Sequence, residues 1–298
     1  MDRIVSQLKT NRPQLTDSTL KTYISILSNL YKRMHGSGDM IDYFEKNIEK
    51  IPSILKDDKQ NVRKTKYAVL VSLFSHKPNI KGLENLRNTM LQDANKYNAS
   101  LREQRLSEKQ KENWMSMDEI KQVYQEMHKR TFPLLKKKQL NKSQFNEVML
   151  FVMLSLYILN KPRRSQDYAL MKIRNYDVEK DNYYDGKLFT FQQYKTSKSY
   201  GDQTIRVSPK LNNILRLWLK LNPYDHLLTT FSGKPLSVSR MTLLFNRIFG
   251  KKISTSMIRH IFLTDRYADV PALTEMDQTS KEMGHSTREA LETYVKKR

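Results

Sequence analysis

The 298-residue chain contains no cysteine, so disulfides, thiolate metal sites and cysteine nucleophiles are excluded. Glycine is scarce, with 8 residues, and no glycine-rich loop of the kind that cradles phosphates is present. The 6 histidines show neither an H-E-x-x-H motif nor the paired spacing of a zinc site. No converging carboxylates of a two-metal nuclease stand out either. The sequence therefore gives no support to ATP-driven or metal-dependent chemistry.

Long apolar runs are also missing. A membrane-spanning helix needs about 18 or more consecutive apolar residues, and no such run occurs. The longest apolar stretch, VMLFVMLSLYIL at 148–159, is more typical of a buried helix. The N-terminal MDRIVSQLKT is polar and lacks the apolar core of a secretory signal. We therefore expect an intracellular protein that is not secreted and has no membrane partner.

Acidic residues are outnumbered by basic ones. The chain has 31 Asp and Glu against 53 Lys and Arg, which gives a formal net charge of +22 at pH 7. Such a surplus favours polyanions, and nucleic acid is a better candidate than an anionic membrane surface. Hydrophobic residues make up 38% of the sequence, enough for packed cores, and the length allows two domains. The composition predicts a basic, two-domain protein that binds nucleic acid.

Residues 1–101 are expected to form the first domain, a small helical bundle. Apolar side chains from Leu20 to Tyr31 recur at helical spacing, and Gly36 ends that helix. Further helices are predicted at 39–48, 61–78 and 83–101. The 61–78 helix begins with three cations that form either a solvated helix end or a face that contacts DNA phosphates. These cations are Arg63, Lys64 and Lys66.

The polar stretch 102–115 is interpreted as a linker, and residues 116–298 as a second domain. Ser116 and Glu119 match a capping box that opens this domain. Two helices are predicted next, at 117–130 and 142–160. β-rich runs at 188–194 and 203–207 then flank a polar, glycine-containing loop, which indicates an antiparallel hairpin. The expected fold is mainly α with a small antiparallel hairpin or sheet.

Four stretches of the second domain carry side chains suited to phosphate chemistry. They are KPRRSQDYALMK, the hairpin FQQYKTSKSYGDQTIRV, STSMIRHIFLTDRY and KEMGHSTREALETYVK. In this order they resemble the tyrosine recombinases, the family of phage-type integrases. The family pattern is an Arg that opens a helix, a Lys on a β-hairpin, a second Arg in a helix, and a Gly-His pair followed nine residues after the His by a Tyr. TLKTYISILSNL is similar to the start of the family's core-binding domain, so the resemblance covers almost the whole chain.

The resemblance implies five catalytic residues, Arg164, Lys195, Arg259, His285 and Tyr294. The two arginines would clamp the non-bridging oxygens of a phosphodiester, and the lysine would protonate the leaving 5′-oxygen. The histidine would hydrogen-bond the phosphate or assist the tyrosine. The tyrosine would form a 3′-phosphotyrosine, which preserves the bond energy for rejoining without metal, ATP or any other cofactor.

Four further positions have supporting or undecided roles. Asp167 takes the place of the family's usual acidic support, Lys198 is the reserve for general acid, and His260 follows the second arginine. Ser256 departs from the family, which usually has a His three residues before that arginine. A serine donates a hydrogen bond but accepts a proton poorly at neutral pH. The group that deprotonates the tyrosine is therefore left open between His285 and substrate-assisted transfer.

The function that the resemblance implies is site-specific recombination or integration of DNA, by a virus or mobile element. The partners would be double-stranded DNA with a specific recombination site and further copies of the chain, from dimer to tetramer. The protein would act in the cytoplasm of a prokaryote, or in a host nucleus or viral factory. Two alternatives are a type IB topoisomerase-like enzyme that relaxes DNA and a catalytically silent DNA-binding protein.

Overall fold

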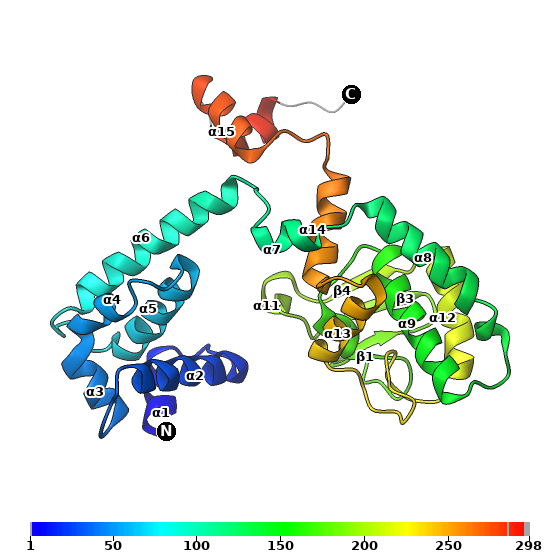
Figure 1. Ribbon diagram of the computed structural model, residues 1–298, viewed down its shortest axis with the longest axis horizontal. Helices are drawn as coiled ribbons and strands as arrows, with labels where there is room; N and C mark the ends of the chain where they lie inside the picture. The colour runs from blue at the N-terminus through cyan, green and yellow to red at the C-terminus, as the bar shows by residue number, and fades with distance from the viewer. Residues whose placement is uncertain (1, 285, 295–298) are drawn as a thin grey trace. The chain divides into compact units, whose positions relative to one another are not determined.

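The computed structural model describes residues 2–284 and 286–294, with side chains as far as residue 292. The chain forms two compact units (Figure 1). The first unit comprises Met1–Arg105 together with Pro271–Arg298, and the second comprises Leu106–Val270. The boundary at Arg105 falls inside the stretch 102–115 that the sequence indicated as a linker. Part of that stretch forms a short helix, α7 (Glu108–Asn113), with a capping box at Ser107.

The N-terminal part of the first unit is helical, as its periodicity predicted. The helix expected at 61–78 is shorter and ends at Phe74. Pro78 has no N–H to donate to the Phe74 carbonyl, and it disfavours helical conformation at Lys77. An additional helix at the N-terminus contributes Ile4 and Leu8 to the core. The elements are α1 (Asp2–Asn11), α2 (Asp17–Arg33), α3 (Met40–Asn47), η1 (Ile48–Lys50), α4 (Ile51–Ile54), α5 (Gln60–Phe74) and α6 (Leu83–Arg102).

The C-terminal segment contributes three short elements to the first unit, which are α15 (Leu273–Glu282), α16 (Thr287–Glu289) and the π-helical turn η3 (Ala290–Tyr294). Two contacts join α15 to the end of α6. Arg102 forms an ion pair with Asp277, and the backbone N–H of Leu273 donates to Gln104 Oε1 at 2.9 Å.

The second unit is also mainly helical. The capping box predicted at Ser116 is present at the start of α8, and the helix predicted at 142–160 forms as α9, whose side chains from Phe151 to Tyr157 are buried. Besides α7, its helical elements are α8 (Met117–Thr131), η2 (Leu134–Lys136), α9 (Lys142–Ile158), α10 (Ser165–Ala169), α11 (Ser197–Tyr200), α12 (Pro209–Leu221), α13 (Val238–Phe249) and α14 (Thr255–Arg266).

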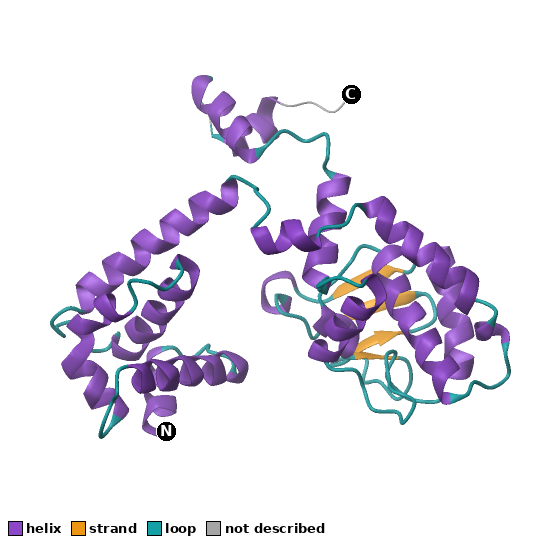
Figure 2. Ribbon diagram, in the orientation of Figure 1, coloured by secondary structure: helices purple, strands orange, loops and turns teal. Residues whose placement is uncertain are grey.

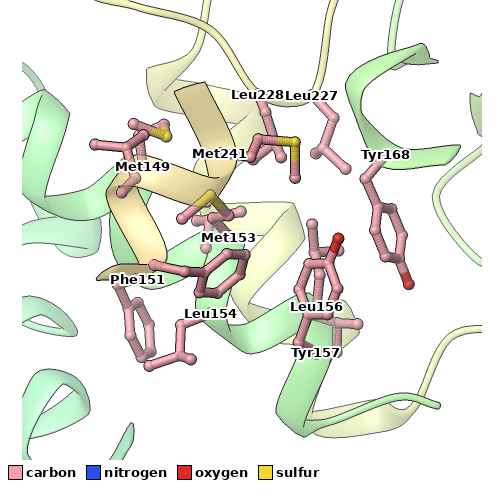
Figure 3. Packing of buried hydrophobic residues seen from close by; sticks show 14 of the residues in the cluster. Met149, Phe151, Met153, Leu154, Leu156, Tyr157, Tyr168, Leu227, Leu228 and Met241 are labelled. Atoms are coloured by element: carbon pink, nitrogen blue, oxygen red, sulfur yellow. The ribbon is translucent and has the colours of Figure 1, made fainter. Parts of the chain in front are cut away.

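The core of the second unit is built around α9. Figure 3 shows Met153 of α9 beside Met241 of α13, and Tyr157 of α9 facing Tyr168 of α10. The rings of Tyr157 and Tyr168 meet edge to face, with centroids 5.5 Å apart. Tyr157, Tyr168 and Met241 are all almost completely buried. This packing fixes α10 against the centre of the unit.

A four-stranded sheet lies among the helices of the second unit (Figure 2). The predicted antiparallel hairpin is confirmed as the pair β3 and β4, and two shorter strands extend it. The spatial order is β1-β2-β3-β4, with β1 parallel to β2 and the other neighbours antiparallel. The strands are β1 (Met171–Lys172), β2 (Asn182–Tyr184), β3 (Leu188–Phe191) and β4 (Gln203–Arg206).

The predicted first strand of the hairpin, 188–194, is too long. β3 ends at Phe191 because the next two backbone N–H groups leave the ladder. Those of Gln192 and Gln193 donate instead to the side-chain oxygen of Asn182, at 2.8 and 2.7 Å. Among the described helices, none is long and apolar enough to cross a membrane.

Candidate active site

A cavity of about 750 Å³ in the second unit is lined by side chains from α10, α14 and the strands β3 and β4. Buried aromatic rings, Tyr168, Phe189 and Phe191, form part of its wall. Five cations lie among the other lining residues. The cationic lining residues are Lys161, Arg163, Arg164, Arg206 and Arg259.

Arg164 opens α10, as the sequence predicted. It is the N-cap residue, with extended backbone angles of φ −69° and ψ 150°, and its carbonyl accepts the N–H of Asp167 at 3.1 Å. Its side chain is half-buried and lines the cavity. Within the described part of the chain, no side-chain hydrogen bond or ion pair engages its guanidinium. The charge is therefore available to an anion.

Arg259 reaches the same cavity from α14. Ile258 and Ile261, which are buried, anchor this helix to the core and leave Arg259 half-buried at its edge. Burial and the Arg164 guanidinium both lower the pKa of Arg259 below its ordinary value. The side chains of Arg164 and Arg259 line the same cavity. No hydrogen bond or ion pair to the Arg259 side chain occurs among the described residues, so this charge is also available.

Asp167 is the third residue of α10 and lines the same cavity as the arginines. Its side chain is 3% exposed, and one carboxylate oxygen accepts from Arg163 Nε at 2.8 Å. The other oxygen is buried and has no hydrogen-bond partner among the described residues. Burial raises the pKa of Asp167, and Arg163, Arg164 and Arg259 oppose that rise. Three guanidinium charges thus act on one buried carboxylate, and only Arg163 is hydrogen-bonded to it. The cavity therefore has a surplus of positive charge.

Lys195 and Lys198 lie on the connection between β3 and β4, where the sequence placed them. Lys195 precedes α11 and Lys198 belongs to it, and both side chains are exposed. Figure 1 shows α11 on a loop that extends outward from the sheet. The two lysines do not line the cavity, but Tyr194 and Thr196, on either side of Lys195, do. The connection therefore borders the cavity while its ammonium groups lie in solvent.

Ser256 and His260 lie on α14 with exposed side chains, one turn before Arg259 and immediately after it. Neither lines the cavity. His285 is outside the described residues, and so is the side chain of Tyr294, whose backbone ends η3. The backbone of Tyr294 belongs to the first unit and the two arginines to the second. Among the described residues, no cluster of His, Cys, Asp and Glu could hold a metal ion.

The three cations at the start of α5 are engaged within the first unit. Arg63 makes two hydrogen bonds of 2.6 Å to the buried Asp93. Lys66 pairs with Asp58 at 2.6 Å, and Lys64 lies over the ring of Tyr97, 3.9 Å from its centroid. The charges of Arg63 and Lys66 are thus balanced by carboxylates. Their contact with DNA phosphates remains a prediction.

The sequence analysis did not identify two polar residues of the site, Arg163 and Asn182. Arg163 was visible as the neighbour of Arg164, but nothing in the pair indicates which one is held by other side chains. The structure separates them, because Arg163 is paired with Asp167 and Gln203 while Arg164 is free of such bonds within the described chain. Asn182 is 1% exposed, and its side chain binds backbone groups of Asp167 in α10 and of Gln192 and Gln193 after β3. A lone Asn in a β-rich run carries no sequence signal for this.

No protein-family model matches the chain, and no curated protein matches its sequence. The fold is of the integrase type. Among solved structures, the chain is similar to lambda integrase (75–356), seen as a dimer bound to a COC′ core site, with a TM-score of 0.55 and 13% identity. The alignment covers 100% of this chain and 96% of that one. At this identity the similarity shows the fold, and it agrees with the family that the motifs resemble.

Proposed function

We propose that this protein is a site-specific DNA recombinase of the tyrosine recombinase type, which cleaves and rejoins DNA through a 3′-phosphotyrosine. The observation that carries the proposal is the pair Arg164 and Arg259, which come from helices 90 residues apart and line one cavity. Each has a guanidinium free of partners among the described residues. The integrase-type fold over the whole chain supports the same reading.

The arrangement of the arginines suits a phosphodiester in its transition state. Attack on phosphorus builds negative charge on the non-bridging oxygens, and planar guanidinium groups donate to such oxygens in a fixed fork. Because both arginines are half-buried, water screens their charge less than it would at the surface. The Asp167 carboxylate offsets part of the positive charge of the arginines, and the remaining charge is available to the substrate.

The remaining steps are assigned to residues of the motif. The Tyr294 oxygen attacks the phosphorus, the bond to the 5′-oxygen breaks, and Lys195 gives its proton to that oxygen, with Lys198 as the alternative donor. The proton of the Tyr294 hydroxyl passes to His285 or, in substrate-assisted transfer, to a phosphate oxygen, and His285 also hydrogen-bonds the phosphate in the second case. Rejoining reverses these steps with the energy stored in the phosphotyrosine bond. The proposed partners are duplex DNA with a recombination site and further copies of the chain, and the proposed setting is integration by a virus or mobile element.

Covalent trapping on a nicked suicide substrate tests the proposal. Such a duplex loses a short leaving strand after cleavage, so the protein stays attached to the DNA. The wild-type chain should form a DNA–protein adduct that survives denaturation, without added metal or nucleotide. A protein that binds the same DNA tightly but forms no adduct would be a silent DNA-binding protein. Relaxation of supercoiled plasmid without pairing of two sites would identify a topoisomerase-like enzyme instead.

A further inference from the structure

Arg163 joins the helix that carries Arg164 to the hairpin that carries Lys195. Its Nε donates to Asp167 on α10 at 2.8 Å, and its Nη1 donates to Gln203 Oε1, the first residue of β4, also at 2.8 Å. The guanidinium lies over the ring of Phe191, the last residue of β3, with 3.9 Å to the centroid. It also lies 5.1 Å from the centroid of Tyr194. One side chain thus contacts α10 and both ends of the β3–β4 connection.

A second link runs in parallel through Asn182. Its Nδ2 donates to the carbonyl of Asp167 at 3.1 Å and to that of Gln193 at 2.9 Å. Its Oδ1 accepts the N–H groups of Gln192 and Gln193. The backbone two residues before Lys195 is therefore tied to the backbone of α10. The bond to Asp167 is buried and the three bonds to Gln192 and Gln193 are partly buried, so competition with water is reduced.

A hydrogen bond also joins the two ends of the connection between β3 and β4. Tyr194 Oη donates to the carbonyl of Gly201 at 2.7 Å, which holds the two ends of the segment 194–201 together. Gly201 has φ 63° and ψ −163°, a conformation that is open almost only to glycine. The ring of Tyr194, 7% exposed, is the same ring that Arg163 faces. The two ends of the loop are thus joined by a hydrogen bond, whereas the side chains of Lys195 and Lys198 are exposed.

We infer that Arg163 is a positioning residue that sets the place of the Lys195 connection relative to the arginine clamp, and so governs protonation of the leaving group. This inference rests on the proposed function. The physical reason is that a general acid must lie within hydrogen-bond reach of the oxygen that it protonates. Arg164 and Lys195 lie 31 positions apart in the chain, and the side chains of Arg163 and Asn182 form hydrogen bonds that link α10 to the β3–β4 hairpin.

A lysine cannot take over this role. Arg163 uses two directions of a rigid fork for two different acceptors and presents a flat face to two rings. An ammonium group has no such plane and no fixed angle between its donors. Arg163→Lys keeps the charge beside Asp167 and should lose the link to Gln203. Gln203→Ala removes only the hydrogen bond from Arg163 to β4, and leaves the pair of Arg163 and Asp167 and the contacts with the rings of Phe191 and Tyr194 intact.

The test measures strand cleavage on two nicked suicide duplexes that differ at one atom, with a 5′-bridging oxygen or a 5′-bridging sulfur. A sulfur leaving group needs no proton, so it bypasses the general acid. On the oxygen substrate, Gln203→Ala should slow cleavage about tenfold and Arg163→Lys up to ~100-fold, within the range that general acids contribute. On the sulfur substrate both should return close to the wild-type rate. Lys195→Ala should show the same rescue, and rescue of Lys198→Ala instead would move the acid to that residue.

Thr204→Ala is the matched control, because Thr204 is exposed on β4 next to Gln203. It should cleave both substrates like the wild type. Hydrogen exchange on the full chain gives a second measurement. Amides of 192–202 should exchange faster in Arg163→Lys and Gln203→Ala than in wild type or Thr204→Ala. Unchanged exchange in both variants would overturn the inference.

Three outcomes of these experiments separate a failure of the inference from a failure of the proposed function. If the wild type is active and Arg163→Lys cleaves the oxygen and sulfur substrates with equally reduced rates, Arg163 acts on the clamp or on folding, and the positioning role is wrong. If neither variant slows the oxygen substrate, that role is also wrong. If the wild type forms no covalent product from either substrate, the proposed function itself fails, and the role of Arg163 in catalysis fails with it.

Discussion

The hydroxyl oxygens of Ser165 and Thr255 lie 2.6 Å apart, in a hydrogen bond between residues 90 positions apart in the chain. Both residues are buried, at 6% and 5% exposure. Ser165 is the first residue of α10 and Thr255 the first of α14, so the bond joins the starts of the two helices. Arg164 directly precedes one end of this bond, and Arg259 lies one turn beyond the other. The bond therefore fixes the spacing of the two arginines.

Thr255→Val should weaken both the fold and the site. Valine keeps the shape of the side chain but leaves the Ser165 hydroxyl without its partner, which costs about 1–3 kcal/mol when the group is buried. Urea denaturation should show that loss in the free energy of unfolding, and cleavage of the suicide substrate should slow at constant folded fraction. The double variant Ser165→Ala/Thr255→Val should lose less than the sum of the single variants. Additive losses would mean that the two hydroxyls do not interact.

Removal of either clamp residue should affect chemistry more than binding. Arg164→Ala or Arg259→Ala should lower the cleavage rate by ~10²–10³, the effect of losing one oxyanion donor. DNA affinity should fall only modestly, because under the proposed function many other cations of the chain would share the phosphate contacts. Arg266→Ala, which removes an exposed arginine of α14, is the control and should cleave normally. Near-normal cleavage by both clamp variants would show that the site is elsewhere.

Much of the fold could be predicted from the sequence because local signals and burial agreed. Helical periodicity, the capping box at Ser116 and the hairpin around Gly201 all give the elements that the structure contains. The end of β3 could not be predicted, because it depends on Asn182, a side chain from the preceding strand. Strand length is decided there by a competing hydrogen-bond acceptor, and no property of residues 192–194 themselves reveals it.

The buried carboxylate of Asp167 should give activity and stability opposite dependences on pH. Burial raises its pKa above the ordinary value, so the folded state binds the proton more tightly than the unfolded state does. The contribution of Asp167 to stability should therefore grow as pH falls through the folded pKa, and be lost as pH rises. Cleavage should change the other way, because the protonated acid holds Arg163 less well.

The measurement compares wild type with Asp167→Asn. The difference in unfolding free energy, wild type minus variant, should increase as the pH is lowered from 7 to about 4, where an unperturbed Asp carboxyl titrates. Over the same interval the cleavage rate of wild type should fall toward that of the variant. The other charges that act on this carboxylate are the guanidinium groups of Arg163, Arg164 and Arg259. A stability difference that does not change with pH would contradict the raised pKa.

Arg63 should matter for the stability of the first unit. Its partner Asp93 has a side chain only 4% exposed, so Arg63→Ala leaves a buried charge without its counter-ion. Such losses typically cost about 3–5 kcal/mol. Thermal unfolding should show this, while Lys59→Ala, which removes an exposed cation just before α5, should unfold like wild type. Normal stability of Arg63→Ala with a large loss of DNA affinity would instead favour the phosphate contact.

The candidate site divides into residues that sequence order could predict and residues that only packing reveals. Arg164 and Arg259 could be found because each stands in a stretch of recognisable residues, and the structure brings both to one cavity. Arg163 could not be separated from Arg164, since its role depends on Gln203 and Phe191, which are distant in the chain. The nucleophile and His285 remain predictions from the motif, because the structure describes neither side chain.

The central claim is that Tyr294 becomes joined to DNA, and mass spectrometry of the trapped adduct tests it most directly. After nuclease and protease digestion, the nucleotide remnant should be found on the peptide that contains Tyr294. Tyr294→Phe should bind the suicide duplex as wild type does and give no adduct, because only the hydroxyl can form the link. A remnant on another residue, such as the exposed Tyr267, or an adduct formed by Tyr294→Phe, would contradict the account.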